Sequence, residues 1–182
     1  MSDRRFFRRL VFAAGALLCA GGAATPALAQ AVSEYAVKSA LLFKLPKFVY
    51  RPEATRDGAI AICVLGRNPF DGALERLAQM PIDRQAVRGL HLGTAVEAAA
   101  CDFVFVARSE KSALDAVLRR LAAYPVVTVS DIEGFASAGG MVEFALGGEN
   151  AAIAILINRR AARAQSFEFN AQLLRLSRVV EP

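Results

Sequence analysis

Two cysteines, Cys63 and Cys101, are the most reactive side chains in the part of the sequence that follows an N-terminal export signal. In an exported protein, two thiols outside a metal-binding pattern most often form a disulfide. The bond would close a loop of about 39 residues and stabilise the fold by about 4 kcal/mol. The alternative is two free thiols buried at separate core positions. A disulfide requires Cα atoms less than about 7 Å apart.

The sequence offers few groups for catalysis or metal binding. His91 is the only histidine, and a lone histidine is more often structural or solvated than catalytic. The spacing of Asp102, Asp131 and Glu133 does not force these carboxylates together for acid–base chemistry. The cysteines, the histidine and the scattered carboxylates match no recognised spacing of metal ligands. We therefore expect no enzyme activity, no metal and no cofactor.

Residues 66–70 follow an expected strand and precede an expected helix, a place where α/β proteins bind anions. The candidate ligand-binding residues there are Arg67, Asn68 and Phe70. The segment lacks both a G-x-G-x-x-G pattern and a P-loop lysine. The alternative, which we favour, is a plain turn in which Asn68 caps the helix.

Basic residues gather near the C-terminus without matching acids: Arg159, Arg160, Arg163, Arg175 and Arg178. Such a surface can dock an acidic partner or a small anion. More often, basic residues on terminal helices form a solvated face. The aromatic interleaving that nucleic-acid-binding surfaces use is absent from this segment, so we expect no nucleic-acid partner.

Residues 1–29 have the three parts of an export signal, namely a basic start, an apolar stretch at 10–20 and small residues at Ala27 and Ala29. We expect cleavage after Ala29. The apolar stretch is shorter than the roughly 20 residues of a membrane-spanning helix. Residues 3–9 resemble a twin-arginine signal, but Asp3 and Arg8 depart from its pattern, so we expect the Sec route. Removing four arginines and one aspartate lowers the net charge from +5 to about +2.

Buried strands and helices alternate along the rest of the chain. The expected strands are 59–65, 86–92, 103–107, 126–129, 141–146 and 151–157. The expected helices are 34–49 with Ser33 as N-cap and an early end at Pro46, 69–79, 94–100, a long helix from Ser109, one from Asn158, and 170–177. The alternation predicts an α/β fold in three layers, with a mainly parallel central sheet, helices on both faces and a C-terminal antiparallel hairpin. We expect residues 30–182 to form a single domain.

Several short segments, in their order and spacing, resemble the YfiR-like family of periplasmic proteins. They are EYAVKSA at 34–40 with 47–49, ICVLG at 62–66 with 68–70, Cys101, 108–110, VTVSDIEGF at 127–135, GGMVEF at 139–144, 157–158 and QLLRLSRVV at 172–180. The resemblance implies a periplasmic repressor. Such a protein binds the periplasmic sensor region of an inner-membrane diguanylate cyclase and lowers cyclic-di-GMP output, which controls biofilm formation.

The resemblance also implies how the repressor is released and how it is built. Release follows redox stress or sequestration on an outer-membrane lipoprotein. Cys63 and Cys101 match a family disulfide position, but the second cysteine pair of YfiR is missing, so we expect a structural bond rather than a redox switch.

For the contact surface we expect an apolar centre with a charged rim. We also expect the chain to form a homodimer. The candidate partner-binding residues are Ser130, Asp131, Phe135, Arg175 and Arg178. The alternative function is a periplasmic receptor for a small ligand that feeds a sensor kinase. It would use the turns at 66–70 and 130–131.

Overall fold

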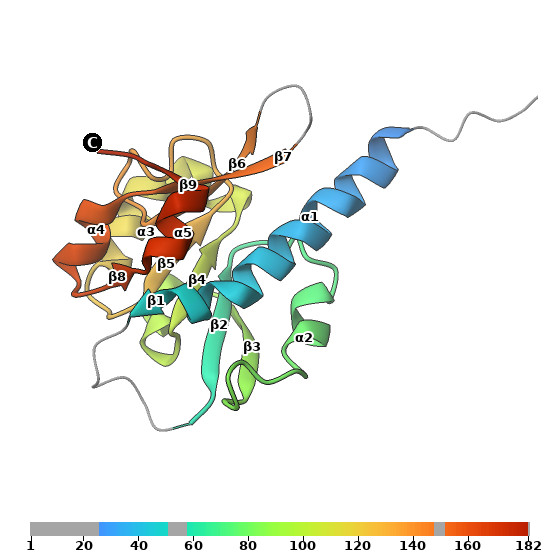
Figure 1. The fold of residues 1–182 in the computed structure, drawn as a ribbon, viewed down its shortest axis with the longest axis horizontal. Helices are drawn as coiled ribbons and strands as arrows, with labels where there is room; N and C mark the ends of the chain where they lie inside the picture. Colours follow the sequence, from blue (N-terminus) through green and yellow to red (C-terminus); the bar gives the residue numbers. More distant parts are fainter. Residues whose placement is uncertain (1–25, 51–57, 148–151, 182) are drawn as a thin grey trace, which may run out of the picture.

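The computed structural model describes residues 26–50, 58–147 and 152–181 (Figure 1). The expected signal peptide lies outside the described residues, apart from its last four residues. These four residues begin helix α1 (Pro26–Lys44).

A seven-stranded mixed sheet forms the centre of the structure. Its order is β3 (Val87–Leu92), β2 (Ile60–Leu65), β4 (Phe103–Val106), β5 (Val127–Ser130), β6 (Val142–Gly147), β7 (Ala152–Ile157) and β9 (Ser177–Val179). The first five strands in this order are parallel, β7 is antiparallel to β6, and β9 is parallel to β7. A separate antiparallel pair joins β1 (Val49–Tyr50) to β8 (Glu168–Phe169).

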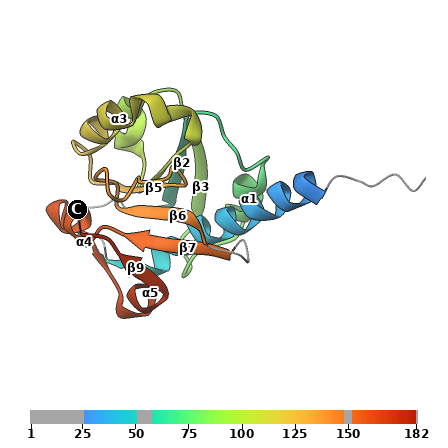
Figure 2. The same ribbon diagram turned by 90° about the horizontal axis from the view of Figure 1, so that it is seen from above.

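Two hydrophobic clusters cover the two faces of the sheet, because successive side chains of a strand point to opposite faces. In β2, Ile62 and Val64 belong to one cluster and Cys63 and Leu65 to the other. The first cluster packs under α1, α2 (Ala73–Leu77) and α5 (Ala171–Leu176). The second packs under α3 (Leu114–Leu121) and the 3-10 helix η2 (Ala95–Ala100). Figure 2 shows α3 on one side of the sheet and α1 and α5 on the other. The predicted three-layer α/β fold is therefore confirmed.

The helix starts differ most from the sequence prediction. Helix α1 already begins at Pro26, so Ser33 lies inside it and is not its N-cap. It ends at Lys44, and Pro46 lies in the 3-10 helix η1 (Leu45–Phe48), as the missing N–H of proline predicts. Residue Ser109 is not an N-cap either, because the chain passes through the 3-10 helix η3 (Arg108–Ala113) before α3 begins.

The C-terminal elements agree better with the prediction. Asn158 caps α4 (Arg159–Ala164) by accepting a hydrogen bond from Ala161 N at 2.9 Å. Asn170 caps α5 in the same way, with Leu173 N at 2.9 Å. The hairpin of β6 and β7 is antiparallel, as expected. Strands β1, β8 and β9 were not predicted.

Candidate functional site

The strand order reverses between β2 and β4, so the crevice at the carboxyl ends of these strands is where open α/β sheets usually bind ligands. Side chains of this protein occupy that place. The backbone N–H of Arg67 donates to Ser109 Oγ at 2.9 Å, and this hydroxyl donates to Glu110 Oε1 at 3.0 Å. Gly66 has φ +89°, and a Cβ there would lie 2.6 Å from Glu110 Oε1. Loop residues of the chain itself therefore line this place and pair with one another.

The candidate ligand-binding residues form a turn. Asn68 Oδ1 accepts from Phe70 N at 2.9 Å, and its Nδ2 donates to Glu75 Oε1 at 3.2 Å. Phe70 is buried, with its ring 4.8 Å from that of Phe105 and edge-on to it. Arg67 is exposed. The turn is as we favoured, but Asn68 does not cap a helix, because α2 begins after Gly72 with φ 72°.

An ionic cluster with a buried centre, here called the Asp131 cluster, joins α1 to the carboxyl ends of β4 and β5. It consists of Asp131, Lys38, Tyr35, Arg108 and Glu34. Asp131 Oδ2 lies 2.7 Å from Lys38 Nζ and 3.1 Å from Arg108 Nε, and it accepts from the Tyr35 hydroxyl at 3.0 Å. Glu34 Oε1 pairs with Lys38 one helical turn away and with Arg108 Nη2 at 3.5 Å.

The charges of the Asp131 cluster balance, with two cations against two carboxylates. The Lys38 ammonium also lies 4.8 Å from the centre of the Tyr35 ring. Burial, followed by the charge of Asp131 and the hydrogen bond to it, raises the pKa of Tyr35 to about 12. Asp131 Oδ1 is buried without a hydrogen-bond partner. With three donors on one oxygen and no solvent access, this carboxylate is suited to fixing α1 on the sheet rather than to exchanging protons with a substrate.

Sequence reasoning missed Lys38. The signal that was present is the Glu34–Lys38 spacing, which places opposite charges on one helix face. The partner Asp131 lies 93 residues further along the chain. No local pattern connects the two residues.

Three of the candidate partner-binding residues are buried. Ser130 is fully buried and donates to Val106 O at 2.7 Å, while Ile132 N donates to Ser130 Oγ at 3.0 Å. Asp131 is 5% exposed, and Phe135 is fully buried. The expectation that these three side chains meet a partner directly does not fit their burial, because a contact surface must be accessible.

The loop that carries Phe135 is held from inside. Both carboxylate oxygens of Glu143 accept hydrogen bonds from it, from Gly134 N at 3.1 Å and from Ala136 N at 2.9 Å. Asn158 Nδ2 donates to Ala136 O at 2.8 Å. A Cβ on Gly140 would collide with the Phe135 ring, so the loop also needs a glycine there. The loop is built as part of the core.

Cys63 and Cys101 form a disulfide with their Cα atoms 6.0 Å apart. Cys63 is fully buried in β2, and Cys101 lies just before β4 at 1% exposure. The bond fastens the two strands on either side of the strand-order reversal. Burial on this scale keeps the bond away from solvent.

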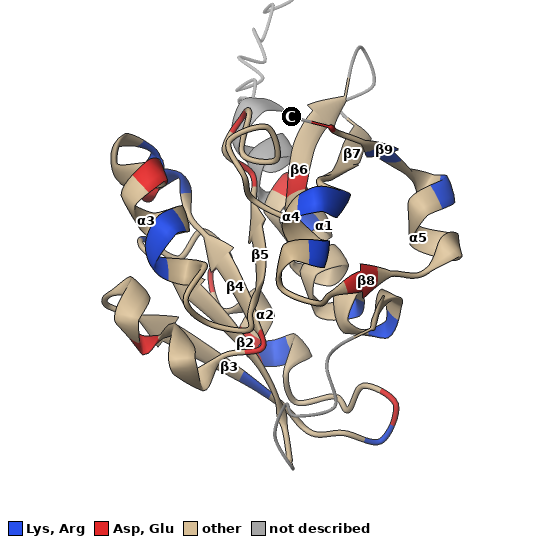
Figure 3. Ribbon diagram, turned by 90° about the vertical axis from the view of Figure 1, so that its left-hand side faces the viewer, with Lys and Arg blue, Asp and Glu red and all other residues tan. Residues whose placement is uncertain are grey.

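The other candidate partner-binding residues, Arg175 on α5 and Arg178 on β9, are exposed. Figure 3 shows basic positions on α4, α5 and β9 at the C-terminal end of the sheet. The described residues from 152 onward carry five arginines against Glu168 and Glu181. This part of the surface is therefore positive.

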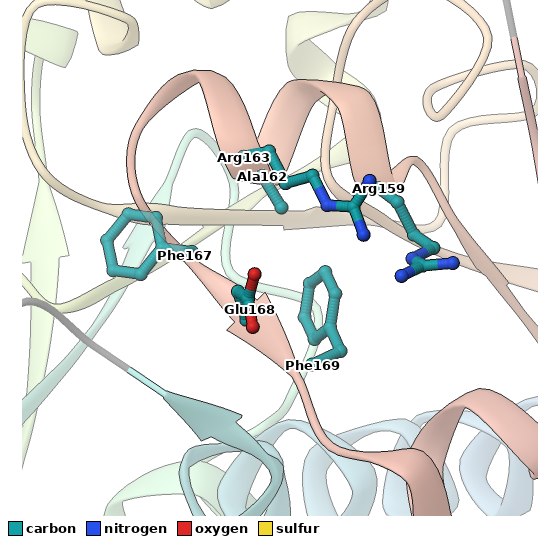
Figure 4. Close-up of a pocket in the computed structure, with 6 residues that line it drawn as sticks. All are labelled: Arg159, Ala162, Arg163, Phe167, Glu168 and Phe169. Atoms are coloured by element: carbon teal, nitrogen blue, oxygen red, sulfur yellow. The ribbon is translucent and has the colours of Figure 1, made fainter.

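A small cavity of about 20 Å³ lies beside α4, and Arg159 and Arg163 project over it next to Glu168 (Figure 4). Its volume is close to that of one water molecule. A larger hollow, of about 410 Å³, lies at the carboxyl ends of β4 and β5. Most of its lining is exposed, and four of its nine residues are charged, including Lys111 and Glu133, whereas Leu114, Ile132 and two alanines are apolar. Neither hollow includes Arg67, Asn68 or Phe70.

Within residues 26–50, 58–147 and 152–181, no helix is long and apolar enough to cross a membrane. In the same part of the chain, no three side chains of the metal-binding types form a group that could hold a metal ion.

Comparisons with known proteins give a family match and several structural neighbours. A sequence model of the family described as YfiR/HmsC-like matches residues 35–178. No curated protein matches the chain. Ten chains of solved structures match.

Two of these structures show the range of the similarity. A conserved domain protein from Vibrio cholerae O1 biovar El Tor has a TM-score of 0.55 at 9% identity. The ABC domain from Streptococcus pneumoniae, solved in complex with L-Trp, has a TM-score of 0.52 at 12% identity. The match covers 81% of this chain and 60% of each neighbour. At these identities the similarity shows the α/β fold alone.

Proposed function

The chain belongs to the YfiR/HmsC-like family, and from this membership we propose that it binds the sensor region of an inner-membrane diguanylate cyclase and lowers cyclic-di-GMP output. The family is one of periplasmic regulators rather than enzymes. The match over residues 35–178, from Tyr35 in α1 to Arg178 in β9, is the observation that carries the proposal.

Two features of the structure support a role through protein contacts. At the strand-order reversal, Ser109 and Glu110 hydrogen-bond to each other and to the backbone of Arg67, so these polar groups already have partners within the chain. The charged groups of the Asp131 cluster pair with each other rather than facing a cleft. The buried disulfide fits an oxidising compartment such as the periplasm.

The contact surface that we propose is the positive C-terminal part with Arg175 and Arg178. An inhibitor shifts a signalling equilibrium only if it binds one state of the sensor more tightly than the other. Exposed cations next to exposed apolar side chains, such as Leu176 at 72% exposure, provide the charged rim and apolar centre of such a contact. We also propose that an outer-membrane lipoprotein sequesters the chain and that the chain forms a homodimer.

The test is a strain that lacks the gene, assayed for cyclic-di-GMP. We expect the level to rise and to return to normal when the full chain is supplied. A copy without residues 1–29 serves as the matched control, because it stays in the cytoplasm and should not restore repression. An unchanged level in the deletion strain would exclude cyclase repression.

The hollow of about 410 Å³ favours a second candidate, a periplasmic receptor for a small ligand that feeds a sensor kinase. Its volume is within the usual range for ligand sites, about 300–1,000 Å³. Its open, charged lining differs from the enclosed polar pocket that this function predicts. L-Trp, the ligand of the Streptococcus neighbour, is the probe to use. A thermal shift that Ile132→Glu abolishes would support the receptor.

A further inference from the structure

Strand β9 forms one edge of the seven-stranded sheet, next to β7 (Figures 1 and 2). We propose that this edge docks an extended segment of the partner protein in which acidic and apolar residues alternate. The inference rests on the proposed function, since it describes how the regulator holds its partner.

Backbone geometry shows which groups of β9 are open. Val180 N donates to Ile157 O at 2.8 Å, so the backbone of residue 180 faces β7. Because alternate residues of a strand direct their backbone groups to the same side, Arg178 also faces β7, while Ser177 and Val179 face outward. The N–H of Ser177 donates to Leu174 O. Within the residues that the structure describes, the outward groups left for an added strand are the carbonyl of Ser177 and both the N–H and the carbonyl of Val179.

The side chains of β9 differ between the two faces of the sheet. Val179 is 43% exposed and shares a face with Val142 and Ile157, which are fully buried. Arg178 is exposed on the opposite face, in register with Leu156. A neighbouring strand would therefore place one residue against Val179 and the next against the Arg178 guanidinium. Alternating apolar and acidic residues suit these two positions, since cross-strand pairs of opposite charge stabilise a sheet.

A second copy of the chain suits this edge poorly. Antiparallel pairing through Val179 of both copies places Arg178 opposite Val180, which offers no opposite charge. Antiparallel pairing of Ser177 with Val179 places Arg178 directly opposite Arg178. At such a non-hydrogen-bonded position the Cα atoms lie only about 4.5 Å apart. Like charges directly opposite each other are destabilising. No ion pair of Arg175 or Arg178 is found among the described residues, so nothing there neutralises these cations. The charge therefore favours an acidic partner.

The first test substitutes Val179 in the full chain and measures cyclic-di-GMP in the deletion strain. Val179→Pro removes the outward N–H and keeps the β7-facing groups, and proline is tolerated at such positions of an edge strand. Val179→Thr keeps the N–H and is the matched control. We expect Val179→Pro to leave the level as high as in the deletion strain, and Val179→Thr to restore most of the repression.

The second test addresses the charge and stays informative if Val179→Pro fails to fold. We expect Arg178→Glu to lose repression and Arg178→Lys to retain most of it. Thermal unfolding of the purified variants shows whether each one folds. If Val179→Pro is folded and represses as well as Val179→Thr, the docking edge is wrong; if Val179→Pro is unfolded, repression by Arg178→Glu equal to that of Arg178→Lys overturns it.

The same assay distinguishes failure of the proposed function from failure of the docking edge. If deletion of the gene leaves cyclic-di-GMP unchanged, the proposed function fails, whereas a raised level that Val179→Pro lowers again overturns the docking edge alone. Sedimentation shows whether a second copy occupies the edge. A wild-type dimer that Val179→Pro converts to a monomer would overturn the acidic partner in favour of a second copy.

Discussion

The ammonium nitrogen of Lys38 and the Oδ2 atom of Asp131 lie 2.7 Å apart, and neither side chain is exposed. The pair joins α1 to the residue that follows β5. Replacing a buried ion pair by well-packed apolar residues is often neutral, whereas removing one partner leaves a buried charge without compensation. The stability with which α1 is held against the sheet therefore depends on both residues together.

We expect Lys38→Met to lower the free energy of unfolding by about 3–5 kcal/mol. The thioether side chain fills a similar volume but leaves the Asp131 carboxylate without its buried ammonium. Urea unfolding of the purified mature chain measures the change. The double variant Lys38→Met with Asp131→Leu is the control, and it should recover most of the loss. A loss below about 1 kcal/mol for Lys38→Met would show that Arg108 and Tyr35 suffice to compensate Asp131.

Tyr35 predicts a specific loss of stability in alkaline solution. Its pKa is raised to about 12 in the folded chain, against an ordinary value of 10.0. Between these values the unfolded chain loses the phenol proton first, so the stabilisation is complete below pH 10 and is lost as pH rises towards 12. We expect wild type to lose more unfolding free energy over this interval than Tyr35→Phe. Other groups titrate in both proteins, so parallel profiles would contradict the assignment.

The disulfide predicts non-additive substitutions. We expect Cys63→Ala and Cys101→Ala each to lower the free energy of unfolding by about 3–4 kcal/mol, because either change opens the same loop. The double variant should cost about as much as either single variant. Denaturant unfolding of all four proteins, with thiol counts on the unfolded chains, makes the comparison. Losses that add would mean that each cysteine contributes separately.

The backbone of Gly140 packs closely against the ring of Phe135. A Cβ at residue 140 would collide with the Phe135 ring, so we expect Gly140→Ala to cost about 1–3 kcal/mol. Gly89→Ala is the control, because its new Cβ would lie 4.0 Å from its nearest neighbours, in Ala78 and Glu75. Thermal unfolding measures both. Recovery of stability when Phe135→Leu is added to Gly140→Ala would identify the ring as the cause.

The sequence predicts the strands of the parallel core and the hairpin, since buried strands appear as short apolar runs with clear ends. Strand β2 illustrates this, with all six residues buried. Asn158 and Asn170 were also identified as helix starts, because each precedes a helix directly. Strand β9 is not predicted, since three residues are too few to show a two-residue period, and its first residue, Ser177, falls at the end of the predicted helix 170–177.

The candidate site was less accessible to sequence reasoning. The disulfide followed from compartment and composition, and Arg175 and Arg178 followed from charge. Ser130, Asp131 and Phe135 stand in a polar, glycine-rich segment that resembles an exposed loop. Long-range partners hold them in place: Val106 accepts from Ser130, Lys38 pairs with Asp131, and Glu143 and Asn158 bind the backbone on either side of Phe135. Long-range contacts of this kind leave no local periodicity.

The burial of Cys63 and Cys101 also limits when their bond can change. To break a disulfide, a thiolate must reach one of its sulfur atoms, and the two cysteines are at most 1% exposed. An oxidant therefore has to act while the chain is still open, and the closed sheet then shields the result from later exchange. The oxidising conditions during folding therefore determine whether a mature molecule contains the bond.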